Sequence, residues 1–153
     1  MLYSYGKLWS DWFLPLTTSY SLNTAEGFAA DISGNRLTCS KSGARIVIPL
    51  KLNPGDVITG IRALWSSADT LNDSLWLTLS YDEFGAGQES WEGLADGIFT
   101  PGPPFHGPEI ASLEFSPITV QEGRVYCILI EYYTTANTCV LWGVGIQTST
   151  RVY

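Results

Sequence analysis

Apolar and polar side chains alternate over short stretches of this chain, and turn residues separate the stretches from one another. In residues 74–81, every second side chain from Leu75 to Tyr81 is apolar, and residues 44–50 repeat the pattern. A period of two places alternate side chains on opposite faces of a strand, and no segment shows the 3.6-residue period of a helix. The pattern therefore predicts an all-β domain.

About eight or nine strands are expected, joined by turns such as Asn53-Pro54-Gly55-Asp56, in which Pro and Gly supply the turn conformations. That number of strands, with long returns between some of them, favours a jelly-roll-like antiparallel β-sandwich. The last two strands are apolar on both faces, so each is expected at the centre of the sandwich or against another subunit. The expected strands are 27–32, 36–40, 44–50, 57–65, 74–81, 111–115, 118–120, 124–133 and 138–147.

Two segments fall outside the strand pattern. Residues 1–24 alternate poorly but are rich in aromatic side chains, so we expect an N-terminal arm that packs along its own domain or a neighbouring chain. Residues 25–153 then form a single β-sandwich domain with a long loop over 82–108, which holds six Gly and four Pro. Loops of that length inside a compact domain are commonly functional or disordered.

Length and charge narrow the class of protein. A chain of 153 residues suits one domain with its own core, and a net charge of −7 argues against a nucleic-acid binder, which needs basic side chains to displace phosphate counterions. The first twenty residues lack the basic start and apolar core of a signal peptide. No apolar run approaches the roughly 18 residues of a membrane span, so synthesis in the cytoplasm without membrane contact is expected.

Acidic side chains are concentrated in the middle of the chain. No Lys or Arg lies between Arg62 and Arg124, where ten Asp and Glu occur, and these carboxylates are expected to face solvent. A calcium site would draw on Asp69, Asp73, Asp82 and Glu83, although their spacing matches no known loop. A glycan hydrolase would need two carboxylates held together, with candidates Glu89, Glu92, Asp96, Glu109 and Glu114.

The sequence offers few of the residues that nucleophilic or thiol catalysis uses. The single histidine, His106, is expected in a loop, and a nucleophilic triad needs a histidine that a carboxylate orients. Cys39, Cys127 and Cys139 are interpreted as buried thiols; the last two lie in adjacent strands and are able to meet across a hairpin. We predict no catalytic, cofactor or metal site and no enzymatic activity.

Aromatic side chains offer the strongest candidates for a binding surface, and they make up 13% of the chain. Trp65 and Trp142 lie in apolar strands and are expected in the core. Aromatic rings outside the core serve either to stack on sugars or to anchor a protein–protein interface, and the sequence does not separate these uses. The interface or ligand candidates are Tyr3, Tyr5, Trp9, Trp12, Phe13, Trp76, Trp91, Phe99 and Phe105.

Residues 44–147 carry a recurring pattern. A strand ends in Pro49-Leu50, a Pro-Gly-Asp turn follows, and Val120, Gly123 and Tyr126 then precede a terminal apolar hairpin. This pattern resembles virion-associated β-sandwich modules of bacteriophages, namely capsid decoration proteins and fibre or spike heads. The resemblance implies a virion location after synthesis in the host cytoplasm, and it transfers no functional residue.

Three functions are therefore weighed. The leading expectation is a non-enzymatic virion structural protein, a homo-oligomer and plausibly a trimer, that contacts itself and other virion proteins. The alternative is a carbohydrate-binding head that recognises a host glycan through Trp91, Phe99 and Phe105, and a small glycan hydrolase is the third. All of them rest on the expectation that one sandwich cannot hide this much apolar surface alone.

Overall fold

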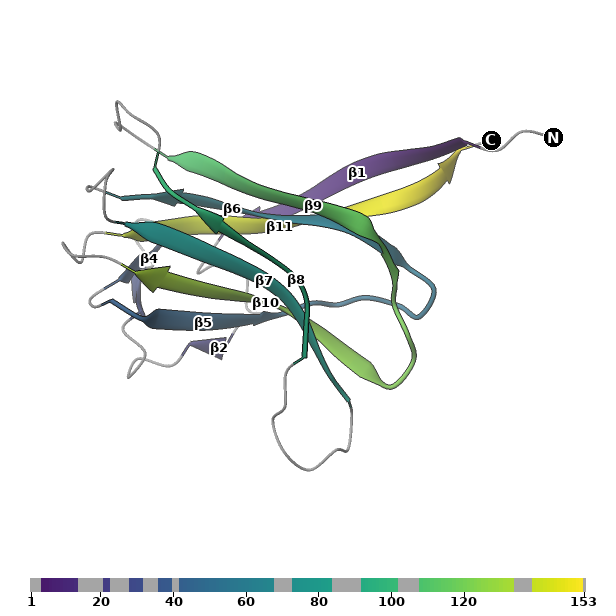
Figure 1. The fold of residues 1–153 in the computed structure, drawn as a ribbon, viewed down its shortest axis with the longest axis horizontal. Helices are drawn as coiled ribbons and strands as arrows, with labels where there is room; N and C mark the ends of the chain where they lie inside the picture. Colours follow the sequence, from purple (N-terminus) through teal and green to yellow (C-terminus); the bar gives the residue numbers. More distant parts are fainter. Residues whose placement is uncertain are drawn as a thin grey trace.

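The computed structural model describes residues 4–13, 21–22, 28–31, 36–39, 42–67, 73–83, 92–101, 108–133 and 139–152. Within these ranges eleven strands form two antiparallel sheets that pack face to face (Figure 1). The predicted jelly-roll-like β-sandwich is thus confirmed, with eleven strands where the pattern indicated eight or nine. The described ranges contain no helix of the length and apolarity needed to cross a membrane.

We name the two layers sheet A and sheet B. Neighbouring strands in both sheets are mostly distant in sequence, as in a jelly roll, and every described strand pair is antiparallel. Sheet A runs in the order β3 (Phe28–Asp31), β4 (Arg36–Cys39), β11 (Val140–Val152), β6 (Val57–Ser66) and β9 (Glu109–Thr119), with β1 (Ser4–Phe13) also paired to β11. Sheet B runs β2 (Ser21–Leu22), β5 (Ala44–Pro49), β10 (Arg124–Tyr133), β7 (Ser74–Glu83) and β8 (Glu92–Phe99).

The core lies between the sheets and is built from the alternate positions that the sequence marks as apolar. Leu75, Leu77 and Leu79 of β7 are completely buried, as predicted from their period of two. Trp65 of β6 is also buried and meets the ring of Tyr132 edge-on, with 6.2 Å between centroids, so the two sheets interlock through aromatic contact. Trp142, predicted in the core, is only half-buried.

Part of the expected N-terminal arm is a strand of sheet A. β1 pairs with β11 from Ser4 opposite Val152 to Phe13 opposite Gly143, and this ribbon extends beyond the rest of the sandwich in Figure 1. Asp11 of β1 lies over Gly145 of β11, so the chain itself covers part of the outer face of its apolar last strand. A strand with no face buried in a core needs no strict alternation of apolar and polar side chains. The sequence pattern therefore did not predict β1 as a strand.

The expectation of a loop over residues 82–108 was wrong for residues 82–83, which end β7, and for residues 92–99, which form β8. β8 pairs with β7 along one edge of sheet B, and its Gly97 is explained by packing and not by a turn. A Cβ on Gly97 would lie 3.1 Å from Leu113 Cδ1 and 3.2 Å from a ring carbon of Phe99, so a side chain there would crowd both residues. Residues 84–91 and 102–107 lie outside the described ranges.

Candidate functional site

The outer face of sheet B combines exposed aromatic rings with polar side chains. Because side chains alternate along each strand, the residues between the buried leucines of β7 point away from the core. Trp76 therefore lies on the outer face, opposite Glu131 of β10 on one side and Ile98 of β8 on the other. In the next outward row Thr78 lies between Leu129 and Asp96. Three strands, β10, β7 and β8, thus present one continuous surface.

Trp76 and Tyr133 form an aromatic pair on this surface. Their ring centroids are 5.3 Å apart and the rings are tilted by 55°. Trp76 is 38% exposed and Tyr133 is 37% exposed, although both residue types are usually more buried. The pair therefore offers two ring faces to solvent beside polar groups.

A groove of about 370 Å³ lies next to this pair. Thr78 brings a hydroxyl and Asp96 and Glu131 bring carboxylates to its lining, so hydrogen-bond donors and acceptors occur together with the Trp76 ring, whereas the lining residue Ser80 is buried. The remaining lining residues are small or apolar: Gly93, Leu94, Ala95 and Leu129. Apolar walls with a few convergent polar groups are typical of small-molecule sites.

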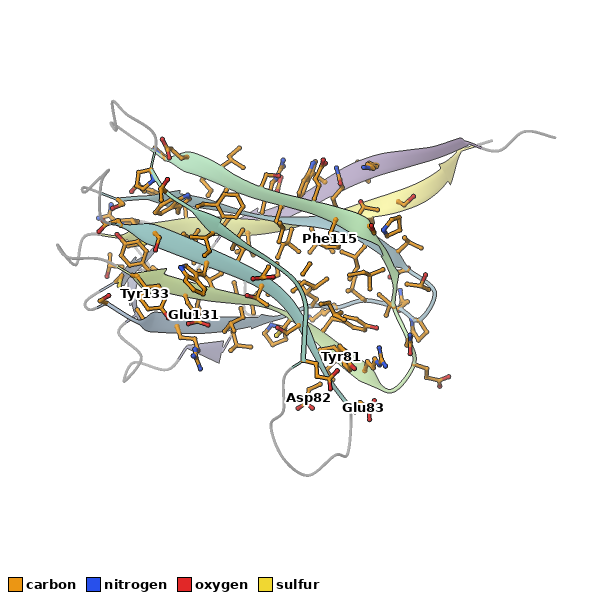
Figure 2. The ribbon with its side chains drawn as sticks, in the orientation of Figure 1. Tyr81, Asp82, Glu83, Phe115, Glu131 and Tyr133 are labelled. Carbon is orange, nitrogen blue, oxygen red and sulfur yellow. The ribbon has the colours of Figure 1, made fainter. Side chains whose placement is uncertain are left out.

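Glu131 organises the polar side of the groove. It accepts a 2.9 Å hydrogen bond from the Tyr133 hydroxyl and lies 3.6 Å from Nη2 of Arg45 on β5. Figure 2 shows Glu131 and Tyr133 together on β10. The hydrogen bond to Glu131 raises the pKa of Tyr133, and burial and the negative charge of Glu131 act in the same direction. Tyr133 therefore keeps its proton and fixes the Glu131 carboxylate.

The opposite end of sheet B holds a second polar cluster, around Tyr81, Asp82 and Glu83 (Figure 2). Tyr81 donates a 2.6 Å hydrogen bond to Glu92, and this bond raises the pKa of Tyr81. The guanidinium of Arg124 lies 4.0 Å from the centre of the Tyr81 ring. Tyr81, Glu92 and Arg124 are engaged with one another, whereas Asp82 Oδ1 is buried and has no hydrogen-bond partner among the described residues.

The expected calcium ligands do not converge. Asp73 and Asp82 stand at opposite ends of β7, about 30 Å apart at 3.3 Å per residue. Asp73 is also buried, contrary to the expectation of a solvated carboxylate, and accepts hydrogen bonds from Ser67 and Tyr132. Among the described residues no three acidic, histidine or cysteine side chains are grouped to hold a metal ion. Asp69 lies outside those residues.

The hydrolase candidates on a common strand are too far apart for a glycosidase pair. Asp96 lies four positions after Glu92 on β8, about 13 Å away, and Glu114 lies five positions after Glu109 on β9, about 17 Å away. Glycosidases hold their two carboxyl groups roughly 5–10 Å apart. Glu89 and His106 lie outside the described residues.

The predicted aromatic candidates divide into three groups. Trp76 is exposed, as a ligand or interface role requires, whereas Trp9 is half-buried against Arg62, whose guanidinium lies 4.2 Å from its ring centre. Phe99, expected as a loop aromatic, instead ends β8 and packs half-buried against the core. Tyr5, Trp12 and Phe13 belong to β1. Tyr3, Trp91 and Phe105 lie outside the described residues.

Tyr133, Glu131 and Thr78 were not among the predicted site residues. The alternation of each strand places them on the outward side, but the β7–β10 register decides that they stand beside Trp76. That register joins residues about 50 positions apart in the chain, and no short-range sequence signal specifies it.

The expected meeting of Cys127 and Cys139 across a hairpin was wrong. Cys127 lies in β10 of sheet B, whereas Cys139 directly precedes β11 of sheet A, so the two are not partners across a hairpin. All three cysteines are buried reduced thiols, as the sequence interpretation held. Burial and the neighbouring charge of Asp82 raise the pKa of Cys127 to about 12.

Comparison with known proteins finds no matching family model and no matching curated protein. Among solved structures, the chain is similar to the CBM22-1–GH10 modules of Clostridium thermocellum endo-1,4-beta-D-xylanase 10B complexed with xylohexaose, with a TM-score of 0.48 and 15% identity. That match covers 93% of this chain and 26% of the xylanase chain, so this chain spans about a quarter of its length. TmCBM61 in complex with beta-1,4-galactotriose gives a TM-score of 0.41 and 9% identity over 94% of this chain and 88% of that chain. With TM-scores below 0.5, these likenesses carry no argument about function, and the function proposed below rests on the geometry of sheet B.

Proposed function

We propose that this protein binds an uncharged oligosaccharide on the outer face of sheet B. The observation that supports the proposal is the exposed Trp76–Tyr133 pair beside a groove whose lining includes two carboxylates and the hydroxyl-bearing Thr78. The C–H face of a sugar ring packs on an aromatic ring, while its hydroxyls need acceptors and donors close by. Trp76 and Tyr133 supply the rings, and Asp96 and Glu131 supply the acceptors.

The charge of the surface favours neutral over anionic sugars. The chain carries a net charge of −7, and Asp96 and Glu131 both line the groove. A sulfated or sialylated glycan would bring further negative charge to the same place and be repelled. Nη2 of Arg45 lies 3.6 Å from Glu131, so the positive charge of Arg45 is partly neutralised by Glu131 and attracts an anionic sugar less.

The shape of the site favours binding over chemistry. The groove is open on a sheet face. Asp96 lies on β8 and Glu131 lies on β10, and strand β7 runs between these two strands, so the two carboxylates are not adjacent. We therefore assign them to hydroxyl recognition.

A glycan array tests this proposal. Wild-type protein is expected to bind neutral oligosaccharides in preference to sulfated or sialylated ones, and Trp76→Ala is expected to lose that signal. Ile110→Ala is the matched control, because Ile110 is an exposed apolar residue on β9 of the other sheet. Binding that survives Trp76→Ala, or binding of anionic glycans alone, would contradict the proposal.

A homo-oligomeric virion component is our second proposed function. Three large apolar side chains, Leu8, Ile98 and Ile110, are more than half exposed, and contact with other chains would cover them. Light scattering of the purified protein tests this proposal. A trimer that Leu8→Ala dissociates would support it, and a monomer at all accessible concentrations would contradict it.

A further inference from the structure

Cys39 and Cys139 stand opposite each other across the β4–β11 pair. The register joins Leu37 to Leu141 and Thr38 to Val140, so the next position joins the two cysteines. The N–H of Cys39 donates a 2.9 Å hydrogen bond to the carbonyl oxygen of Cys139. Hydrogen-bonded residues of an antiparallel pair have Cα atoms about 5.5 Å apart, within the 4.4–6.8 Å span that disulfides bridge.

The two side chains also point the same way. Residues directly opposite in an antiparallel pair project from the same face, and each cysteine lies two positions from a completely buried leucine of the core. Cys39 and Cys139 are themselves 5% and 1% exposed. The pKa of Cys139 is raised well above its ordinary value by burial and further by the neighbouring Cys39 and Asp73, in agreement with this placement.

We propose that Cys39 and Cys139 are a modification site: they form a cross-strand disulfide when a small-molecule disulfide such as oxidised glutathione is present. One cysteine, as thiolate, attacks a sulfur of the small disulfide and releases one small thiolate, leaving a mixed disulfide. The second cysteine thiolate then attacks the protein sulfur of that mixed disulfide and releases the second small thiolate. The two cysteine protons pass to the released thiolates, so two protein thiols are oxidised and one small disulfide is reduced to two thiols.

The disulfide would strengthen a short seam of sheet A. β4 pairs with β11 at two register positions, and β3 joins the described sheet through β4. A bond between Cys39 and Cys139 closes a loop of about 100 residues, for which chain entropy predicts large stabilisation. We expect oxidation to raise Tm by about 5–15 °C.

The test uses the full chain, purified reduced and then incubated with oxidised glutathione at mildly alkaline pH. Intact mass is expected to fall by two hydrogen atoms, and digestion with trypsin and chymotrypsin is expected to yield a peptide pair linked through Cys39 and Cys139. Cys127→Ala is the matched control, since Cys127 lies on the other sheet, and it should oxidise and gain Tm as the wild type does. Cys39→Ala and Cys139→Ala should neither form the disulfide nor show a higher Tm after incubation with oxidised glutathione.

Oxidised glutathione reaches buried cysteines slowly in the folded protein. The test is therefore repeated by refolding the reduced chain in a glutathione buffer, because the cysteines are accessible while the chain is unfolded. Failure to lose two hydrogen atoms in both experiments would overturn the proposal. A bond through Cys127, or an oxidised form with unchanged Tm, would overturn it as well.

Discussion

Tyr132 donates a 2.6 Å hydrogen bond to Asp73, and both residues are buried. Ser67, which follows β6 of sheet A, also donates to Asp73 and lies 2.9 Å from the Tyr132 hydroxyl. A buried carboxylate is costly unless hydrogen bonds replace its hydration. These contacts explain why an acidic residue is tolerated in the interior, and they join β10 of sheet B to the end of β6.

Removal of the Tyr132 hydroxyl is expected to destabilise the fold. Tyr132→Phe takes one donor from a buried carboxylate, and we expect a loss of about 1–3 kcal/mol in the free energy of unfolding, measured by urea titration. Tyr133→Phe is the control, because its hydrogen bond to Glu131 lies at the surface and its loss should change stability by less than about 0.5 kcal/mol. Equal effects of the two changes would refute the structural role of the buried cluster.

A side chain at Gly145 is expected to displace the carboxylate of Asp11. A Cβ there would clash with Asp11 Oδ1, and this carboxylate accepts a 2.8 Å hydrogen bond from Arg62 Nε. We expect Gly145→Ala to cost about 1 kcal/mol in urea titration, because the Asp11–Arg62 ion pair is lost. In the background Asp11→Ala the same change should cost less, which a double-mutant cycle measures.

Gly93→Ala serves as the control for that prediction. The nearest atom to an added Cβ at Gly93 is Thr78 Cγ2 at 3.6 Å, an ordinary contact. If this change were as destabilising as Gly145→Ala, the close approach of β1 to β11 would not be the cause.

Stability is expected to fall at high pH through Cys127. Its pKa is raised to about 12 in the folded protein from an ordinary value of 9.0, so the unfolded chain loses the thiol proton first. Between pH 9 and about 12 the folded state binds more protons, and the free energy of unfolding therefore decreases as pH rises. Below pH 9 this thiol contributes no pH dependence.

Cys127→Ala tests whether this thiol causes the decrease in the free energy of unfolding at high pH. The variant should show a shallower decline than wild type over the same range, by up to about 1.4 kcal/mol per pH unit. Identical slopes would show that other groups, such as Tyr81 and Tyr133, whose pKa values are also raised, carry the dependence.

Affinity for the oligosaccharide should depend on the exposed ring of Trp76. Truncation of a central aromatic contact commonly costs more than 1 kcal/mol, so Trp76→Ala is expected to raise Kd by about tenfold or more in calorimetry. Glu131→Gln removes the charge but keeps a carbonyl acceptor, and we expect a smaller loss. Val125→Ala, on the same strand but outside the groove, should leave Kd unchanged.

Local patterns predicted the strands but not how they are arranged. The period of two in residues 74–81 identified β7 and its buried leucines because one face of that strand is enclosed by the core. β8 escaped prediction because it is an edge strand in which Gly93 and Gly97 replace apolar residues. The arm residues of β1 escaped for a related reason, since they form a ribbon beyond the main sheet.

The candidate site was predictable only in part. Trp76 was marked as outward by its own strand, whereas its partners Glu131 and Tyr133 come from a strand about 50 residues later. Likewise, Cys39 and Cys139 are neighbours only because β4 and β11 pair over a long loop. Pairing between distant strands depends on packing of the whole core, which a local pattern does not contain.

Chemical-shift mapping of the backbone amides during titration with neutral oligosaccharides tests the central claim most directly. The account predicts shifts confined to β7, β8 and β10 around Trp76, Asp96 and Glu131, and their loss in Trp76→Ala. Shifts centred on Trp9 and Arg62 of sheet A, or no shifts with any neutral oligosaccharide, would contradict it.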